Sequence, residues 1–127
     1  MRIISTYVHG ILDYVTGLLL IAAPYMFGFA NGGAAQWVPM VLGVAAILYS
    51  LLTRYEWGLV KVIPMPAHLA IDGAHGALLA ASPWLFGFAH EVYMPHLLLG
   101  LFEIAVTAMS RSAPDAARET RPGAFSH

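Results

Sequence analysis

Two pairs of histidine and aspartate occur with the same spacing in this sequence. His9 precedes Asp13 by four residues, and His68 precedes Asp72 by four residues. A four-residue step places two side chains on the same face of a helix, so each pair forms one polar stripe. Imidazole exchanges protons near neutral pH, and imidazole and carboxylate both ligate metals. The pairs therefore indicate proton or ion chemistry, a metal or haem site, or a structural hydrogen-bonded pair.

Two further ionisable residues extend this set. His75 follows Asp72 by three residues and shares its helix face, and Glu103 is a carboxylate in a later apolar segment. The remaining histidines, at positions 90, 96 and 127, are expected to be exposed. The candidate polar or proton cluster is His9, Asp13, His68, Asp72, His75 and Glu103.

The composition is typical of a membrane protein. Of the 127 residues, 59% are hydrophobic and 10% are charged, whereas a soluble domain has about 25% charged residues. A soluble fold of this size could not bury so much apolar surface. The net charge of -1 gives no basic excess for nucleic acid, so the lipid bilayer is the expected partner. Without cysteine the chain has no disulfide and no thiolate metal site.

Four apolar segments are long enough to cross a hydrocarbon core of about 30 Å, which requires roughly 20 helical residues. We predict these spans at residues 3–29, 37–53, 67–88 and 92–109. Both His/Asp pairs then lie within spans, where unpaired ionisable groups cost several kcal/mol. Such residues indicate a functional site, although each aspartate could instead hold the helices in register by accepting a hydrogen bond.

The positive charges predict one orientation. The six Lys and Arg residues lie at the N-terminus, between the second and third spans, or in the tail: Arg2, Arg54, Lys61, Arg111, Arg118 and Arg121. Under the positive-inside rule this multi-pass chain has both termini in the cytoplasm. We divide it into a first two-helix repeat (1–55), a cytoplasmic interfacial linker (56–66), a second repeat (67–110) and a disordered cytoplasmic tail (111–127).

An internal repeat supports this division. A shift of 59 positions superposes the two His/Asp pairs, Gly17 on Gly76, and the Phe-Gly-Phe-Ala run at 27–30 on that at 86–89, and a shift of 57 aligns the later helices. Because each unit holds two spans, both copies enter the membrane in the same direction. The predicted fold is all-α, a transmembrane four-helix bundle built from two tandem parallel two-helix repeats.

The run Ser82-Pro83-Trp84, followed by Leu-Phe-Gly-Phe, resembles the signature of the SPW repeat family of small bacterial membrane proteins. The first unit has Ala23-Pro24-Tyr25 at the equivalent place. The resemblance extends over residues 7–109 and implies a membrane repeat protein of the bacterial inner membrane, with no known activity to carry over.

The repeated motif has a structural interpretation. A proline near a helix end frees a carbonyl, a following glycine can end the helix, and an aromatic side chain there lies near the lipid headgroups. The residues of this structural motif are Pro24, Tyr25, Gly28, Ser82, Pro83, Trp84 and Gly87.

Several functions remain open from the sequence. The favoured one is a non-enzymatic scaffold or accessory subunit of a membrane assembly, contacting other membrane proteins or forming a homo-oligomer, because no nucleotide loop or catalytic motif is present. The alternatives are proton or ion transport through the cluster, and a metal or haem between His9 and His68. Gly43 and Gly100, in the second and fourth helices, could serve either the bundle or a dimer contact.

Overall fold

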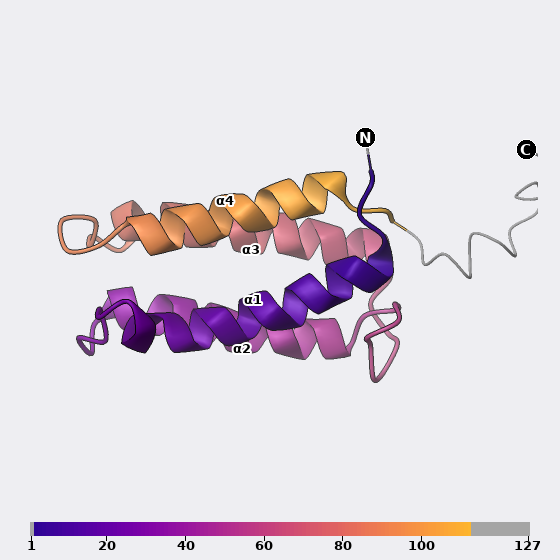
Figure 1. Cartoon of the computed structure of the whole chain (residues 1–127), viewed down its shortest axis with the longest axis horizontal. Helices are drawn as coiled ribbons and strands as arrows, with labels where there is room; N and C mark the ends of the chain where they lie inside the picture. Colours follow the sequence, from indigo (N-terminus) through magenta and orange to yellow (C-terminus); the bar gives the residue numbers. More distant parts are fainter. Residues whose placement is uncertain (1, 113–127) are drawn as a thin grey trace, which may run out of the picture.

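The protein is described here by a computed structural model covering residues 2–112, and over that range four helices run side by side (Figure 1). The helices are α1 (Thr6–Met26), α2 (Ala34–Leu51), α3 (Met65–Leu85) and α4 (Met94–Met109). Helix α1 packs against α2, α3 packs against α4, and the two pairs contact each other. The predicted all-α fold with two two-helix repeats is confirmed. Nearly all of the predicted tail at 111–127, with His127, lies outside the described residues.

The helix starts follow from local sequence. The Ser5 hydroxyl accepts a hydrogen bond from the Val8 N–H at 3.2 Å and caps α1. Pro66 and Pro95 lie in the first turns of α3 and α4, where a backbone N–H has no partner within the helix. These starts set how far along each helix the polar residues lie.

The first helix of each repeat ends in the same way. Gly28 and Gly87 have φ angles of 75° and 73°, in the left-handed region that favours glycine. The phenylalanine after each glycine donates its N–H to the carbonyl of the helix's proline, at 2.8 Å in both repeats. This six-to-one bond is the Schellman motif, and it turns the chain toward the second helix of the pair.

The serine of the Ser-Pro-Trp motif has a specific partner. Pro83 has no N–H to donate to the carbonyl of Leu79, four residues earlier. The Ser82 hydroxyl donates to that carbonyl instead, at 2.7 Å. The first repeat has Ala23 at the equivalent position, so it lacks this hydroxyl.

Glycines bring the two helices of each repeat into close contact. A Cβ atom on Gly43 would lie 2.6 Å from the Gly17 carbonyl oxygen, and one on Gly100 would lie 2.5 Å from that of Gly76. The α1–α2 and α3–α4 crossings therefore each require two glycines. Gly43 and Gly100, whose role was open from the sequence, serve contacts within the chain.

The two repeats are also joined where their helices begin and end. Backbone bridges pair Ile4 with Ser110 and, at the equivalent positions of the repeat, Ile63 with Thr53. Each bridge links the segment before one helix to the end of another, so the N-terminus, the α2–α3 connection and the end of α4 lie at one end of the molecule (Figure 1). We call this the Arg/Lys end, because all the described Arg and Lys residues lie in these segments.

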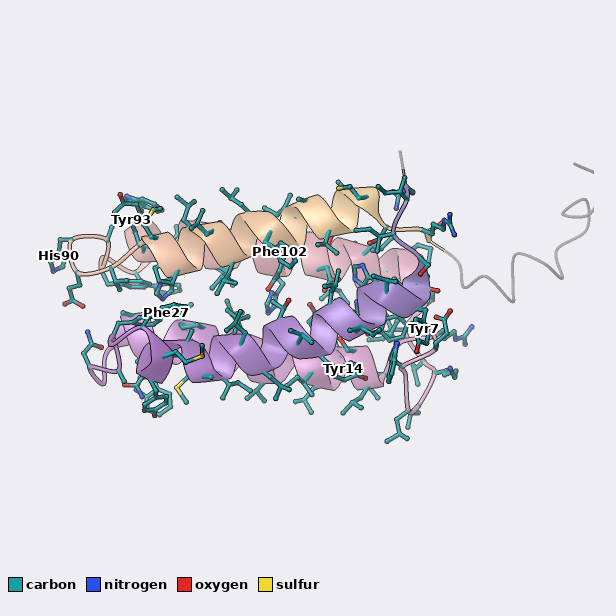
Figure 2. The ribbon with its side chains drawn as sticks, viewed as in Figure 1. Tyr7, Tyr14, Phe27, His90, Tyr93 and Phe102 are labelled. Atoms are coloured by element: carbon teal, nitrogen blue, oxygen red, sulfur yellow. The ribbon has the colours of Figure 1, made fainter. Side chains whose placement is uncertain are left out.

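Apolar side chains cover the outside of the helices. Leu18, Val41, Leu78 and Leu98 are 61%, 61%, 40% and 54% exposed, one on each helix. Tyr7 lies at the Arg/Lys end, and Phe27 and Tyr93 lie at the opposite end (Figure 2). An apolar band between aromatic ends is typical of a protein surrounded by lipid.

The helices differ in how well they suit a membrane span. Of the four predicted spans, α1 and α2 are long and apolar enough to cross a membrane, and α4 is apolar but has 16 residues. Helix α3 has 21 residues but does not meet the same standard of hydropathy. Its interior histidines and aspartate explain this lower hydropathy, and they face the site described next.

Candidate functional site

The two His/Asp pairs meet between α1 and α3. His9 Nε2 lies 2.6 Å from Asp72 Oδ2 and 3.1 Å from Asp13 Oδ1. His68 Nε2 lies 2.9 Å from Asp13 Oδ2 and 3.1 Å from Asp72 Oδ2. The shorter contact of each imidazole reaches the other repeat, and one donor atom from each of the four residues lies within 4.8 Å of the others. We call these four residues the His/Asp box.

Two hydroxyls orient the imidazoles. His9 Nδ1 lies 2.6 Å from Ser110 Oγ, and His68 Nδ1 lies 2.6 Å from Thr53 Oγ1. Each hydroxyl donates its own hydrogen to the carbonyl four residues earlier, at 2.6 and 2.7 Å. A hydroxyl has one hydrogen, so each must accept from the imidazole, and each Nδ1 carries a proton. The arrangement leaves both Nε2 atoms facing the carboxylates.

The number of protons in the box follows from these contacts. A lone pair on Nε2 cannot face a carboxylate oxygen at 2.6 to 2.9 Å without a proton between them. Each shorter contact therefore holds one proton, written as an imidazolium beside a carboxylate. Two such pairs sum to zero net charge, which limits the cost of burying them.

Two tyrosines supply further hydrogen bonds to the carboxylates. Tyr49, on α2, donates its hydroxyl to Asp72 Oδ1, and Tyr55 donates to Asp13 Oδ2 at 2.7 Å. Burial, reinforced by the charge of Asp13, raises the pKa of Tyr55, so its hydroxyl stays protonated and donates. Tyr55 lies in the connection after α2 and is 1% exposed.

Sequence reasoning did not identify the hydroxyl and tyrosine partners. Thr53 and Ser110 correspond at the shift of 57 positions that aligns the later helices, so the repeat itself contained the signal. Tyr49 and Tyr55 have no tyrosine at the equivalent positions of the second repeat. Their roles depend on contacts between helices that no spacing revealed.

The other two predicted cluster residues form a separate pair. His75 Nδ1 lies 2.5 Å from Glu103 Oε2, and His75 Nε2 donates to the Leu42 carbonyl at 2.7 Å. A carbonyl only accepts, so Nε2 carries a proton. Glu103 Oε1 is buried and has no hydrogen-bond partner among the described residues.

A small cavity lies between the box and this pair. Its volume is about 20 Å³, which is enough for a single water. Phe102, which lines it, lies near the middle of the helix length (Figure 2). The polar residues lining the cavity are His9, Asp13, Thr16, Tyr49, Asp72 and Glu103.

Between the site and the end opposite the Arg/Lys end, the interior is mainly apolar. Leu20 and Leu79 are fully buried, and Phe29 and Phe88, which follow the ends of α1 and α3, belong to a core cluster. The box and the His75–Glu103 pair thus lie toward the Arg/Lys end. Mainly apolar side chains fill the remaining length of the interior, together with the buried polar residues Gln36, Ser82 and His96.

His96 corrects one expectation from the sequence. It was predicted to be exposed, but it is 1% exposed. Its ring contacts those of Phe29 and Phe88, and its Nε2 donates to the Ala35 carbonyl at 2.8 Å. The packing of the two repeats covers this helix start. His90 is exposed.

The donor set of the box suits a metal ion. Imidazole nitrogen and carboxylate oxygen together ligate zinc and other divalent first-row metals. The Nδ1–H bonds to Ser110 and Thr53 are of the kind that orients metal-bound histidines.

Comparison with known proteins gave one match. The family model described as the SPW repeat domain matches residues 7–110. No curated protein and no solved structure matches the chain. The match covers both repeats and all four residues of the box.

Proposed function

Given that this chain belongs to the SPW repeat domain family of small membrane proteins, we propose that it is a metal-binding membrane module whose His/Asp box holds one divalent first-row metal ion. The observation that carries this proposal is the convergence of four donor atoms within 4.8 Å, two from each repeat. The supporting arguments come from the orientation, spacing and charge of those donors.

The imidazoles are oriented as a metal requires. A metal-bound imidazole is neutral, with one nitrogen on the metal and an N–H on the other. Ser110 and Thr53 accept from Nδ1 of His9 and His68, so Nε2 is the ligand atom once its proton leaves. Such outer partners fix the ring and raise the basicity of the ligand.

The nitrogen-to-oxygen spacing of the donors is slightly smaller than in a metal site. With ligand bonds of about 2.0–2.1 Å, neighbouring donors of a tetrahedral site lie about 3.3 Å apart. The nitrogen-to-oxygen distances in the box are 2.6 to 3.1 Å. Binding an ion would require side-chain shifts that lengthen these nitrogen-to-oxygen distances by about 0.2–0.7 Å. A haem would require His9 and His68, whose ring centroids are 5.4 Å apart, to separate much further.

The charge of the box also favours a divalent ion. Two carboxylates, two neutral imidazoles and one dication sum to zero, as do two carboxylates and two imidazoliums. Metal binding would thus replace two protons without adding net charge to a buried site, where uncompensated charge is costly.

The test is a metal titration of the purified protein in mild detergent. After chelator treatment, we expect one Zn²⁺ per chain in equilibrium dialysis with elemental analysis. His68→Ala should lose this binding, and His90→Ala, which removes an exposed imidazole, should keep it. Circular dichroism and size-exclusion profiles check that each variant is folded.

Two further variants keep the test conclusive if His68→Ala fails to fold. Asp13→Asn and Asp72→Asn keep the side-chain volume and remove one anionic ligand each, so each should weaken Zn²⁺ binding. A folded native protein that retains no stoichiometric Zn²⁺, Mn²⁺, Fe²⁺ or Co²⁺ would refute the proposal.

A scaffold or accessory subunit is the second candidate function. It is favoured by a separate observation, that every residue of the box is already hydrogen-bonded within the chain. The box would then hold the two repeats in register, and the exposed apolar faces would contact other membrane proteins or a second copy. A metal-free protein that co-purifies with a defined partner would support this candidate. Transport has less support, because the interior between the site and the opposite end consists mainly of apolar side chains, among them Leu20, Leu79 and Phe88.

We further propose that the chain lies in the bacterial inner membrane with both termini, and the His/Asp box, toward the cytoplasm. The positions of Arg2, Arg54, Lys61 and Arg111 at one end of the molecule support this orientation. Since the chain has no cysteine, single-cysteine variants can test it.

In intact cells, a membrane-impermeant thiol reagent should label Asn31→Cys, in the α1–α2 connection. It should label Leu59→Cys, which replaces a side chain that is 78% exposed, only after the cells are permeabilised. The opposite pattern would invert the orientation.

A further inference from the structure

We infer that the cavity beside the His/Asp box is an open coordination position of the metal site, filled by one water molecule whose hydrogen bond is accepted by Glu103. This inference rests on the proposed metal site and specifies its type. A closed four-ligand site is structural, whereas a site with an exchangeable water can bind or activate a small ligand.

The cavity has the size and the lining that one water requires. Its volume is about 20 Å³, and a buried water needs two to four polar partners. His9, Asp13 and Asp72 line it, so three of the four proposed ligands border the same space. A molecule in the cavity would lie next to an ion held by the box.

Glu103 provides the acceptor on the far side of the cavity. Its Oε2 is bound to His75 at 2.5 Å, and His75 is anchored in turn to the Leu42 carbonyl. Its Oε1 is buried without a partner among the described residues. A buried unpaired carboxylate oxygen is costly, and a water in the cavity would satisfy it.

The two repeats differ at this cavity. The residues of the box and their hydroxyl partners have equivalents in both repeats. Glu103, by contrast, corresponds to Ala46, and His75 corresponds to Thr16. Both Ala46 and Thr16 line the cavity together with Glu103. The second repeat therefore contributes a histidine–glutamate pair, whereas the smaller Ala46 and Thr16 of the first repeat leave space for the cavity. A site that only tied the repeats together would need neither feature.

The experiment uses the Co²⁺-loaded protein in detergent. Bound water is detected as broadening of the Co²⁺ electron paramagnetic resonance signal in ¹⁷O-enriched water, and coordination number is read from the visible bands, which are weaker for five ligands than for four. We expect ¹⁷O broadening and a five-coordinate spectrum for the native chain.

A cavity-filling variant provides the matched comparison. Ala46→Val adds two methyl groups to the cavity wall, so it should keep Co²⁺, abolish the ¹⁷O broadening and convert the spectrum to the four-coordinate form. Ala45→Val makes the same change at a neighbouring position that does not line the cavity, and it should behave as the native protein.

Glu103→Leu, which has a similar volume and removes both carboxylate oxygens, tests the acceptor. Loss of an outer-shell hydrogen bond typically lowers metal affinity 10- to 100-fold, so we expect Co²⁺ to bind about 10-fold more weakly and its visible bands to shift. An unchanged spectrum and affinity would refute the role of Glu103.

The outcomes separate the two proposals. A native protein that binds Co²⁺ with a four-coordinate spectrum and no ¹⁷O broadening overturns the open position and leaves the metal site intact. A native protein that binds no Co²⁺ or other divalent metal overturns the metal site, and this inference with it.

Discussion

The contacts between the repeats predict which hydrogen bonds in the His/Asp box stabilise the folded protein. His9 contacts Asp72 of the other repeat at 2.6 Å and Asp13 of its own helix at 3.1 Å. A double-mutant cycle measures the energy of each contact separately. The substitutions are His9→Ala, Asp72→Asn and Asp13→Asn, singly and in the two pairs, all in chelator so that no metal contributes.

The expected magnitudes follow from the geometry. Removing one partner of a buried charged pair costs about 3–5 kcal/mol. The amide introduced by Asp72→Asn retains one acceptor oxygen for the Tyr49 hydroxyl, so we expect this substitution to cost about 3 kcal/mol. The coupling energies measured by the two double-mutant cycles should differ. Membrane helices remain largely helical when their packing is lost, so the His9–Asp13 contact within α1 is present in both the folded and the unfolded state and contributes little to the free energy of unfolding. The His9–Asp72 contact between helices exists only in the folded state.

The assay is reversible unfolding in mixed detergent and dodecyl sulfate, followed by tryptophan fluorescence. We expect a coupling of about 2 kcal/mol for His9–Asp72 and less than about 0.5 kcal/mol for His9–Asp13. Equal couplings, or a larger one within the helix, would refute the conclusion that the box joins the two repeats.

Three further predictions concern the glycines and the hydroxyl partners of the box. Gly43→Ala should lower the free energy of unfolding by about 2 kcal/mol, because its Cβ would lie 2.6 Å from the Gly17 carbonyl oxygen. The control is Gly73→Ala, where no atom lies within 4 Å of the added Cβ. It should be neutral or stabilising by up to about 1 kcal/mol in the same unfolding assay. Gly87→Ala should cost about 1–2 kcal/mol in that assay, because φ is 73° there; a stability equal to the native value would contradict the helix-end argument. Thr53→Ala should weaken Zn²⁺ binding about 10- to 100-fold in competition with a chromophoric chelator, whereas Thr53→Ser, which keeps the hydroxyl, should stay within a few-fold of native.

Features that depend on neighbours along the chain were predictable from the sequence. Helical periodicity, prolines at helix starts and glycines after helix ends are local signals, and the observed helices α1 to α4 lie within a few residues of the predicted segments. The repeat added long-range information, because two copies of one unit pack in equivalent ways. Equivalent His/Asp stripes were therefore expected at similar depth.

The tertiary structure decided which side chains meet. A stripe on a helix does not reveal what it faces, because the rotation of each helix depends on packing against the others. The glycine crossings at Gly17 and Gly76 bring α2 close to α1 and α4 close to α3. The backbone bridges place the Thr53 and Ser110 hydroxyls beside the imidazoles. The same packing buries His96 between aromatic rings of both repeats, contrary to the expectation of exposure.

The sequence by itself determined that the chain has two copies of a two-helix unit, that its exterior is apolar, and that four ionisable residues recur in register. Only the tertiary structure decided that these four form one box and that His75 and Glu103 form a separate pair beside a cavity. The physical reason is that local spacing sets the position of a side chain on its own helix, whereas contacts between helices depend on side chains distant in the chain that pack together only in the folded protein.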